Sequence, residues 1–401
     1  MCIRDRCNLN QIQDQQYELN IMNDYFFTEE HGLIRDLVSD FANTKLSPLT
    51  TKMDKEDYFP IELFYELGKL GFLAPTVSLD DGGSGFDYIA QSIILEELAK
   101  ISPAFALSIG AHSNLMLDNF YRNSNDVQKE KYLDKLITGQ IIGALSITEP
   151  DTGSDALGMK TLAKQQDDFF YITGSKTYIT NAPIANVSIV YAKTKDENKN
   201  YHISAFLVDL SLPGVTKGNP MSKMGMRGSL TGELFFDNVK VHKSDILGEL
   251  HKGKEILMSG LSIERAVLAS ISLGISKTSL KIALEYSKER IQFGKPISKF
   301  QMIQDKLATM YTETKASHLL VYWALSEIQN DHKKNKEAAA SILFAAEKST
   351  KHSLEAIQIL GGAGYMTEYQ IERFMRDAKL LEIGAGTTEI RKLIIAKDLI
   401  N

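Results

Sequence analysis

The chain has 401 residues, of which 43% are hydrophobic and 24% charged, and its formal net charge is -6. This length allows two or three domains with a sizeable core, and the composition excludes a disordered chain or a coiled coil. The acidic balance argues against partners such as nucleic acid or an anionic membrane, because phosphate contacts need clustered Lys and Arg. No segment reaches the roughly 18 consecutive apolar residues that a membrane-spanning helix needs. We therefore predict a soluble globular protein.

Cysteine and histidine usage excludes further classes. Cys2 and Cys7 are the two cysteines, so neither a disulfide framework nor a cysteine metal site can hold the fold. The eight histidines show no H-x-x-x-H spacing, and we predict no metal site. Segment 1–24 lacks the apolar stretch of a secretory signal, and we interpret it as a disordered or non-native extension. The expected location is the cytoplasm of a bacterium, or the mitochondrial matrix if the source is eukaryotic.

Residues 25–138 predict an N-terminal helical domain. Apolar residues recur at helical spacing after Thr28, which we expect to cap the first helix. Pro60 opens another helix, because proline is tolerated in the first turn. The string DDGGSG at 80–85 predicts a turn, and a helix resumes at 88–99.

Residues 139–252 predict a middle β-domain that is mainly antiparallel. Short apolar runs rich in Tyr, Ile and Thr are separated by glycines, prolines and Asn/Asp clusters. The runs cover 141–147, 170–179, 187–192, 203–208 and 234–241.

Residues 253–401 predict a C-terminal helical domain, because long amphipathic stretches cover 256–287, 301–329 and 336–360. The predicted fold class is therefore α+β, in the order helical, β, helical. No G-x-G-x-x-G string follows a strand and opens a helix, and no Walker loop is present, so we expect no Rossmann site.

Glu264 is the most informative single residue. On the predicted helix it shares one face with four apolar residues, at positions 257, 261, 268 and 271. A carboxylate on an apolar stripe is costly unless it is paired or neutral. Two interpretations follow: a buried salt bridge or helix–helix hydrogen bond, or a general base whose pKa burial has raised toward 7.

Three other segments are weaker candidates. TEPDTGSD at 148–155 offers hydroxyls and free backbone N–H groups for a polar cofactor, or is an ordinary loop. Arg290 and Gln301 could bind a phosphate-bearing ligand, or lie in a surface turn. GAGTTE at 384–389 could seat an anion at a helix N-terminus, or form a plain helical turn.

Taken together, the motifs resemble those of the acyl-CoA dehydrogenases, and within that family most closely the isovaleryl-CoA dehydrogenases. The resemblance covers roughly residues 25 to 401. Nine strings carry it in order: FPIELFYELGKLGFLAP, GAHSNL, ITEPDTGSD, GSKTYITN, KMGMRGSLTGELFF, LMSGLSIERAVLA, RIQFGKPISKFQ, QILGGAGY and RDAKLLEIGAGTTEIRK.

The resemblance implies a fold, a cofactor and a reaction. The fold is an N-terminal helical domain, a middle antiparallel β-domain and a C-terminal four-helix bundle, assembled as a homotetramer. The cofactor is FAD, lying between the β-domain and the C-terminal helices. The reaction is α,β-dehydrogenation of an acyl-CoA: a base removes the α-proton while the β-hydrogen leaves as hydride to the flavin. The implied electron acceptor is an electron-transfer flavoprotein; an acyl-CoA oxidase or a silent acyl-CoA-binding protein are the alternatives.

The position of the base separates subfamilies. Most members carry it as the Glu of a Y-E-G-T string, whereas this chain has G-A-G-T with Ala385 in that place. Glu382, three residues earlier, is not its equivalent. Isovaleryl-CoA and long-chain acyl-CoA dehydrogenases instead carry the base in an L-x-x-E-R helix, which maps onto Glu264. The resemblance thus implies Glu264 as the catalytic base.

The resemblance also implies binding residues. The substrate is expected to meet Ser154, Ser262, Ile263, Arg265, Ala385 and Gly386, with the Ala385 N–H as a donor to the enolate-like oxygen. The FAD is expected to meet Leu145, Ile147, Thr148, Gly153, Tyr178, Ile179, Thr180, Thr387, Thr388 and Glu389. Arg290, Phe293, Gln301, Gln358, Gly361 and Gly362 are expected to hold the FAD of a neighbouring subunit. Glu255 stands where isovaleryl-CoA dehydrogenases have Tyr, so we expect isovaleryl-CoA first and a longer or otherwise branched acyl-CoA as the alternative.

Overall fold

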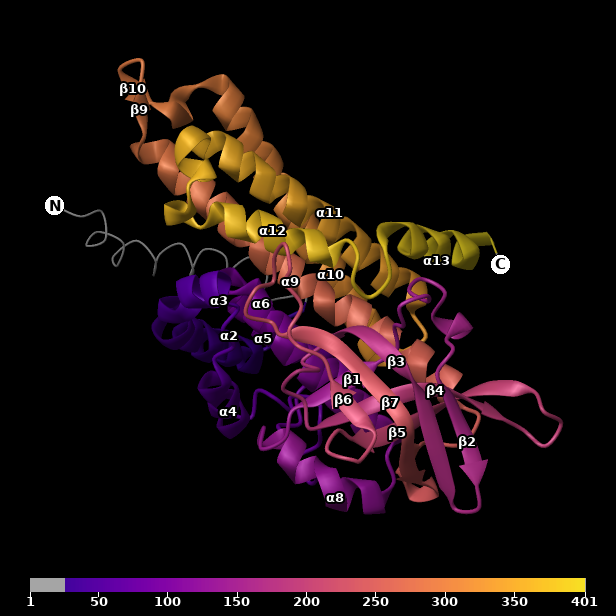
Figure 1. Ribbon diagram of the computed structural model, residues 1–401. Helices are drawn as coiled ribbons and strands as arrows, with labels where there is room; N and C mark the ends of the chain where they lie inside the picture. Colours follow the sequence, from indigo (N-terminus) through magenta and orange to yellow (C-terminus); the bar gives the residue numbers. More distant parts are fainter. Residues whose placement is uncertain (1–25, 401) are drawn as a thin grey trace.

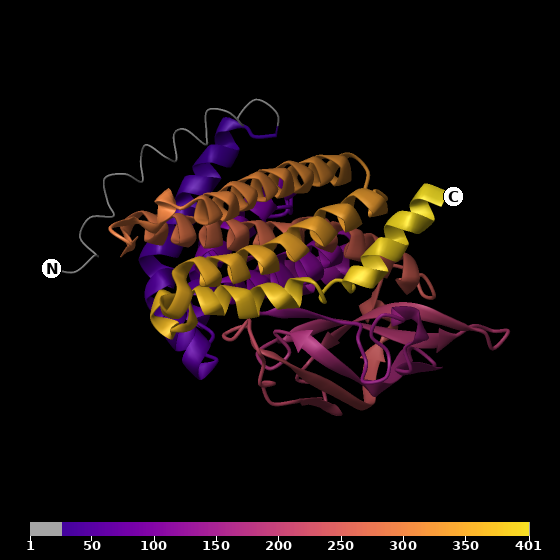
Figure 2. The ribbon, with the colours of Figure 1, turned by 90° about the horizontal axis from the view of Figure 1, so that it is seen from above.

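The computed structural model describes residues 26–400, so the extension predicted at 1–24 lies outside the described residues. N-terminal helices, a middle β-sheet and long C-terminal helices follow one another along the chain (Figure 1). Seen from above, the two sets of helices form one body and the sheet lies against its side (Figure 2). This is the α+β architecture expected from the sequence, although the exact domain boundaries stay predictions.

The N-terminal helices pack against one another through their apolar faces, which the sequence shows as apolar residues at helical spacing. Thr28 caps the first helix as predicted: its hydroxyl accepts a hydrogen bond from the His31 N–H, and the His31 ring accepts one from the Thr28 N–H. The helices are α2 (Glu29–Phe41), α3 (Thr50–Glu56), α4 (Ile61–Lys69), α5 (Tyr88–Ile101), α6 (Pro103–Gly110), α7 (Asn119–Asn123) and α8 (Asp126–Ile137); the π-helical segments are η2 (Ala42–Leu46) and η4 (Ala111–Asp118), and η3 (Ser47–Leu49) is a short 3-10 turn.

The middle sheet has the strand order β6-β7-β3-β2-β4-β5-β8, with β1 paired to β4. Its strands are β1 (Gly143–Ser146), β2 (Leu162–Gln166), β3 (Phe169–Thr180), β4 (Val187–Lys195), β5 (Tyr201–Asp209), β6 (Val215–Lys217), β7 (Thr231–His242) and β8 (Ile246–Leu247). Most pairs are antiparallel, but β4 pairs with β1 and β2 in parallel. The register between β3 and β7 shifts between Lys176 and Ile179, which places a bulge near Tyr178.

The C-terminal helices are α9 (Gly253–Glu289), α10 (Gln301–Asn330), α11 (Asn335–Leu360), α12 (Ile371–Leu381) and α13 (Thr388–Ile400). The first four pack on one another, and α13 packs on α11. A small hairpin of β9 (Ile291–Gln292) and β10 (Lys295–Pro296) joins α9 to α10 at the tip of the helical body (Figure 1).

Helix α9 is the core of the helical body. It is long and apolar enough to cross a membrane by length and composition alone, yet 78% of its most apolar window is buried inside the fold. Every residue from 262 to 276 is buried, because α5, α10, α11 and α12 pack around this part of the helix. Its apolar composition is therefore that of a core helix.

Two contacts fix the β-domain against the helices. The His112 ring accepts a hydrogen bond from the Gly143 N–H at 3.0 Å and donates one to the Leu136 carbonyl at 3.0 Å, so it ties the end of α8 to the start of β1. On the other side, Gly225 lies against α12 so closely that a Cβ atom would come within 2.3 Å of the Arg376 backbone. The neighbouring Met226 N–H donates to the buried Asp377 carboxylate.

Candidate functional site

Glu264 lies in the first third of α9 and its side chain is buried, with 9% of the residue exposed. Leu257, Leu268 and Ile271 on the same face are also buried, as the apolar stripe predicted. Among residues 26–400, none hydrogen-bonds or ion-pairs with the carboxyl group. Burial raises its pKa from 4.5 to about 7, and the positive charges of Arg265 and Arg391 oppose that rise.

The turn after α12 is held against α9 by Arg265, the residue that follows Glu264. Arg265 Nε donates to the Ala385 carbonyl at 3.0 Å, and an Nη atom lies 3.8 Å from the place of a Cβ on Gly386. Ala385 has a φ of +55°, which is unusual for a residue with a side chain. Within the described residues, its N–H has no acceptor. The turn thus presents a free backbone donor near the buried carboxyl group.

Arg391 is a member of this site that the residue patterns did not single out. It is fully buried in α13, and its Nη2 donates to the carbonyls of Leu381 and Gly384. The sequence feature that could have pointed to Arg391 is its place on an apolar helix face, four residues after Thr387. An isolated arginine on such a face is, however, as easily read as exposed.

The loop after β1 is fastened by a buried ion pair. Lys176 Nζ donates to the Glu149 carboxylate at 2.9 Å and to the Ile147 carbonyl at 3.0 Å, while Glu149 accepts from the N–H groups of Lys160 and Thr161. Burial lowers the pKa of Lys176 to about 8 in spite of Glu149. These bonds fix the backbone around Thr148, whose carbonyl accepts from the Thr177 N–H at 2.9 Å.

This loop and the bulge of β3 form one surface beside α9. Leu145 and Ile147 pack against the same apolar cluster as Leu261, one turn before Glu264. Tyr178 has a φ of +57° and is 69% exposed, because the bulge turns it outward. Both views place the α12–α13 turn on the side of the helical body that faces this sheet (Figures 1 and 2).

The part of the β-domain that includes this surface fits a large cofactor with a flat ring and a polar chain. A Cβ atom added at Gly153 would have no heavy atom within 4 Å, so the backbone there is open to a ligand. The Thr152 hydroxyl is buried and has no partner among the described residues, and an orphan of this kind is available to a bound polar group. The exposed Tyr178 ring and Thr180 complete the surface, and buried Ile179 supports it from beneath.

A second group of expected residues gathers at the opposite end of the helices. Arg290 ends α9, Phe293 in the hairpin is 93% exposed, and Gln301 begins α10. Gln358 is exposed near the end of α11, and Gly361 and Gly362 follow it with open space around them. The contact of the Tyr286 and Tyr369 rings at 5.6 Å brings these ends together. This distal group lies far from Glu264 along α9.

Three residues expected to contact the substrate, Ser154, Ser262 and Ile263, lie in three different environments. Ser154 is exposed in the loop after β1. The hydroxyl of Ser262 bonds to Asn335 and to the Met258 carbonyl, so it faces the start of α11 rather than the α12–α13 turn. Ile263 is part of the main hydrophobic core. The structure therefore brings Ala385 and Gly386 to Arg265, next to Glu264 on α9, and does not bring Ser262 or Ile263 into the turn.

The first residues of α13 lie just beyond the turn. The Thr388 N–H donates to the Glu382 carbonyl at 3.0 Å, and the Thr387 hydroxyl accepts from the Ile390 N–H at 3.4 Å. Glu389 is exposed in the first turn of the helix. The half-buried Thr387 and Thr388 and the exposed Glu389 thus border the site.

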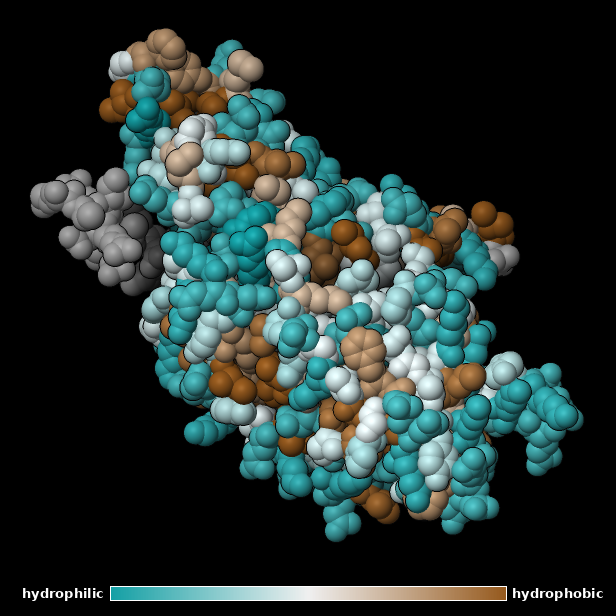
Figure 3. Space-filling view, viewed as in Figure 1, coloured by the Kyte–Doolittle hydropathy of each residue, from teal (hydrophilic) through white to brown (hydrophobic). Residues whose placement is uncertain are grey.

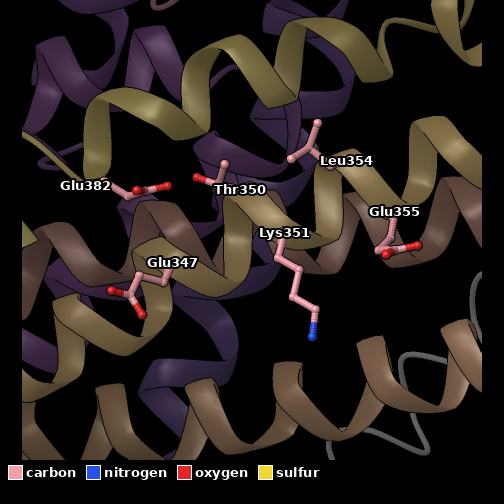
Figure 4. A pocket seen from close by; sticks show the side chains of 6 residues that line it. All are labelled: Glu347, Thr350, Lys351, Leu354, Glu355 and Glu382. Atoms are coloured by element: carbon pink, nitrogen blue, oxygen red, sulfur yellow. The ribbon is translucent and has the colours of Figure 1, made fainter.

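One hollow in the surface does not coincide with the expected site. A hollow of about 420 Å³ on the outer side of α11 is lined by Glu347, Thr350, Lys351, Leu354, Glu355 and Glu382 (Figure 4). It contains none of the residues expected to bind a ligand. Over the part of the chain that the structure describes, no three His, Cys, Asp or Glu residues lie together in a way that could hold a metal ion.

Comparisons with known proteins agree over most of the chain. Three family models match: acyl-CoA dehydrogenase N-terminal domain at 28–140, middle domain at 144–239 and C-terminal domain at 251–400. A mitochondrial isovaleryl-CoA dehydrogenase of Solanum tuberosum is 41% identical over 375 residues, which are 93% of this chain and 91% of the relative. A 3-(aryl)acrylate reductase of Clostridium sporogenes is also 41% identical, over 94% of this chain and all of the relative.

Solved structures have the same fold. Butyryl-CoA dehydrogenase from Megasphaera elsdenii is 37% identical, covers 94% of this chain and 100% of its own, and superposes with a TM-score of 0.91. An FAD complex of PigA covers 94% of this chain and 99% of its own at 30% identity, with a TM-score of 0.89.

Proposed function

The chain belongs to the acyl-CoA dehydrogenase family of flavin-dependent oxidoreductases and uses FAD, and from this premise we propose that it dehydrogenates a short branched-chain acyl-CoA. The proposed reaction converts isovaleryl-CoA to 3-methylcrotonyl-CoA. The observation that carries the proposal is Glu264: a buried carboxyl group with no partner among the described residues, whose pKa is raised to about 7.

Glu264 is the proposed catalytic base. A carboxylate with a pKa near 7 is ionised in about half of the molecules at neutral pH and is basic enough to accept a proton from a weak carbon acid. Burial also removes the water that would compete for its lone pairs. When bound, FAD supplies the redox chemistry by accepting the hydride from the β-carbon. Glu264 then holds the α-proton until it is lost to solvent.

The α12–α13 turn is proposed to stabilise the charge that develops on the thioester oxygen. The Ala385 N–H has no acceptor within residues 26–400. Arg391 bonds to the Gly384 carbonyl of the same peptide unit, and Arg265 bonds to the Ala385 carbonyl of the next one. A fixed donor costs no reorganisation when the negative charge forms, and this is the requirement for an oxyanion site. The small residues Ala385 and Gly386 leave room for the thioester where other family members carry a glutamate.

We propose that the loop after β1 and the β3 bulge hold the flavin ring, through Leu145, Ile147, Thr148, Gly153, Tyr178, Ile179 and Thr180, with Thr387, Thr388 and Glu389 near it. The Lys176–Glu149 pair keeps this loop in place. The distal group is proposed to hold the FAD of a neighbouring subunit, in a homotetramer.

The choice of isovaleryl-CoA rests on similarity and on the place of the base. Relatives named for isovaleryl-CoA, for arylacrylate and for butyryl-CoA are all similar to this chain. A pocket distinguishes one methylene by only about 1–3 kcal/mol, so the same chemistry on a longer or otherwise branched chain is the alternative. The proposed electron acceptor is an electron-transfer flavoprotein; a solved structure 34% identical to this chain bears the name of that protein from Acidaminococcus fermentans.

The test replaces the base and leaves the rest of the site. Glu264→Gln should keep its FAD and its affinity for acyl-CoA but lose turnover by about 10² to 10⁴, because the amide cannot accept the α-proton. Glu285→Gln is the matched control, since it makes the same change at an exposed position of the same helix. Near-normal turnover in Glu264→Gln would place the base elsewhere.

A further inference from the structure

Arg391 is buried in a way that its hydrogen bonds do not explain. Its Nη2 donates to the carbonyls of Leu381 and Gly384, but Nε and Nη1 are buried and have no acceptor among the described residues. Leaving such donors unsatisfied costs free energy, and an apolar side chain in a buried ionic position is often as stable. A purely structural clamp would therefore not require a guanidinium group.

The turn that Arg391 holds is the one proposed to meet the thioester. Arg391 binds the carbonyls of residues 381 and 384 from α13, while Arg265 binds the carbonyl of Ala385 from α9. Two arginines from different helices thus fix three carbonyls within five residues. The Ala385 N–H cannot move without breaking one of these bonds.

On the side of Arg391 that faces Glu264, positive charges outnumber negative ones. Arg265 and Glu264 act on it from α9, and Glu382 and Glu347 act on it from the α12 end and from α11. Both of the latter line the hollow on the outer surface, where water screens them (Figure 4). On the inner side, Arg265 and Arg391 face one buried acid, Glu264, so the buried part of the site carries a net positive charge when that acid is ionised.

We infer that Arg391 is a positioning residue for Glu264: it fixes the α12–α13 turn and places a permanent positive charge near the carboxyl group, which allows that group to work as a base at neutral pH. The inference rests on the proposed function of Glu264. It assigns Arg391 no contact with the substrate.

The test measures the ionisation of Glu264 directly, without turnover. The protonated carboxyl group gives an infrared C=O band, which in the FAD-loaded enzyme is assigned by its absence from Glu264→Gln. Arg391→Met and Arg391→Gln both remove the charge, and either one that folds and retains FAD serves. The midpoint of the band should move upward by about 0.5 to 1 pH unit, since a lost positive charge favours the neutral acid. Arg391→Lys keeps the positive charge, so its midpoint should lie close to the wild-type value.

Lys392→Gln is the matched control, because it removes a positive charge one residue away at an exposed position. Its midpoint should stay at the wild-type value. A lower melting temperature in the Arg391 variants with an unchanged midpoint would overturn the inference and leave Arg391 a structural clamp. This outcome differs from failure of the proposed function, in which Glu264→Gln would retain turnover whatever the midpoint does.

Discussion

The carboxyl group of Glu264 is buried and has no hydrogen-bond or ion-pair partner among residues 26–400, and this has a cost that depends on pH. Its pKa is about 7 in the folded protein, against 4.5 as its ordinary value. Between these values the folded state binds more protons than the unfolded state, so this group makes stability fall as pH rises from about 4.5 to 7. Above pH 7 the loss is complete and amounts to at most about 3 kcal/mol.

We therefore expect the folded protein to become more stable when the charge of Glu264 is removed. Glu264→Gln should melt at a higher temperature than the wild type at pH 8, and the difference should vanish near pH 4.5, where both side chains are neutral. Thermal unfolding followed by circular dichroism at the two pH values measures this. An equal difference at both would mean that the amide changes packing rather than charge.

Activity should have the opposite pH dependence at the same residue. Because the base must be ionised, kcat/KM should rise with pH through a midpoint of about 7. A profile already flat between pH 5.5 and 8 would contradict the assignment of the base.

At the scale of elements, His112 shows how one buried ring joins two domains. It sits between the Leu136 carbonyl and the Gly143 N–H, and burial lowers its pKa to about 4. The unfolded chain takes up a proton at this histidine near pH 6.5, whereas the folded protein does not do so until about pH 4. Stability from this group is therefore present above pH 6.5 and is lost as pH falls toward 4.

Replacing His112 with a side chain that cannot titrate should remove this acid sensitivity. The Gln amide of His112→Gln can donate to Leu136 and accept from Gly143, so the junction persists. The decrease in stability between pH 7 and 5 should shrink by about 2 kcal/mol, measured by urea unfolding. His202→Gln, at a partly exposed histidine, is the control, and an equal effect there would refute the role of His112.

The elements that the sequence predicts well are those with a long periodic signal. The helices α9, α10 and α11 begin and end within a few residues of the predicted ranges, and so do β3, β4 and β5. Short strands such as β6 and β8 escape prediction, because their pairing depends on neighbours far away in the chain. Arg391 escaped for a similar reason: its guanidinium group is buried against the turn after α12, and its bonds to the Leu381 and Gly384 carbonyls depend on how the chain folds back there.

The whole molecule presents its two expected ligand-binding groups at opposite ends of α9. Arg290 follows Glu264 by 26 residues, which is about 39 Å along a helix, so we expect the distal group to serve another copy of the chain. The surface at this end of the helices is apolar, because the side chains of Ile291, Phe293 and Met302 are all largely exposed there. Hydrophobic atoms gather at this tip in the space-filling view (Figure 3).

Sites shared between copies predict complementation. Arg290→Ala alone should lose FAD on gel filtration, and Glu264→Gln alone should lose turnover. Co-expressed in one assembly, the two variants can form sites with Glu264 from one copy and Arg290 from another. The mixed assembly should be more active than the sum of its parents. No gain, together with full FAD retention by Arg290→Ala, would show that each chain holds its own cofactor.

The most direct measurement of the central claim is an anaerobic titration of the FAD-loaded protein with isovaleryl-CoA, followed by the absorbance of the oxidised flavin. The wild type should bleach rapidly and stoichiometrically, whereas Glu264→Gln, with the same flavin content, should bleach at least about 100-fold more slowly. A wild-type protein that bleaches with other thioesters but not with isovaleryl-CoA would contradict the proposed substrate. Equal bleaching rates in the two proteins would contradict the claim that Glu264 is the base.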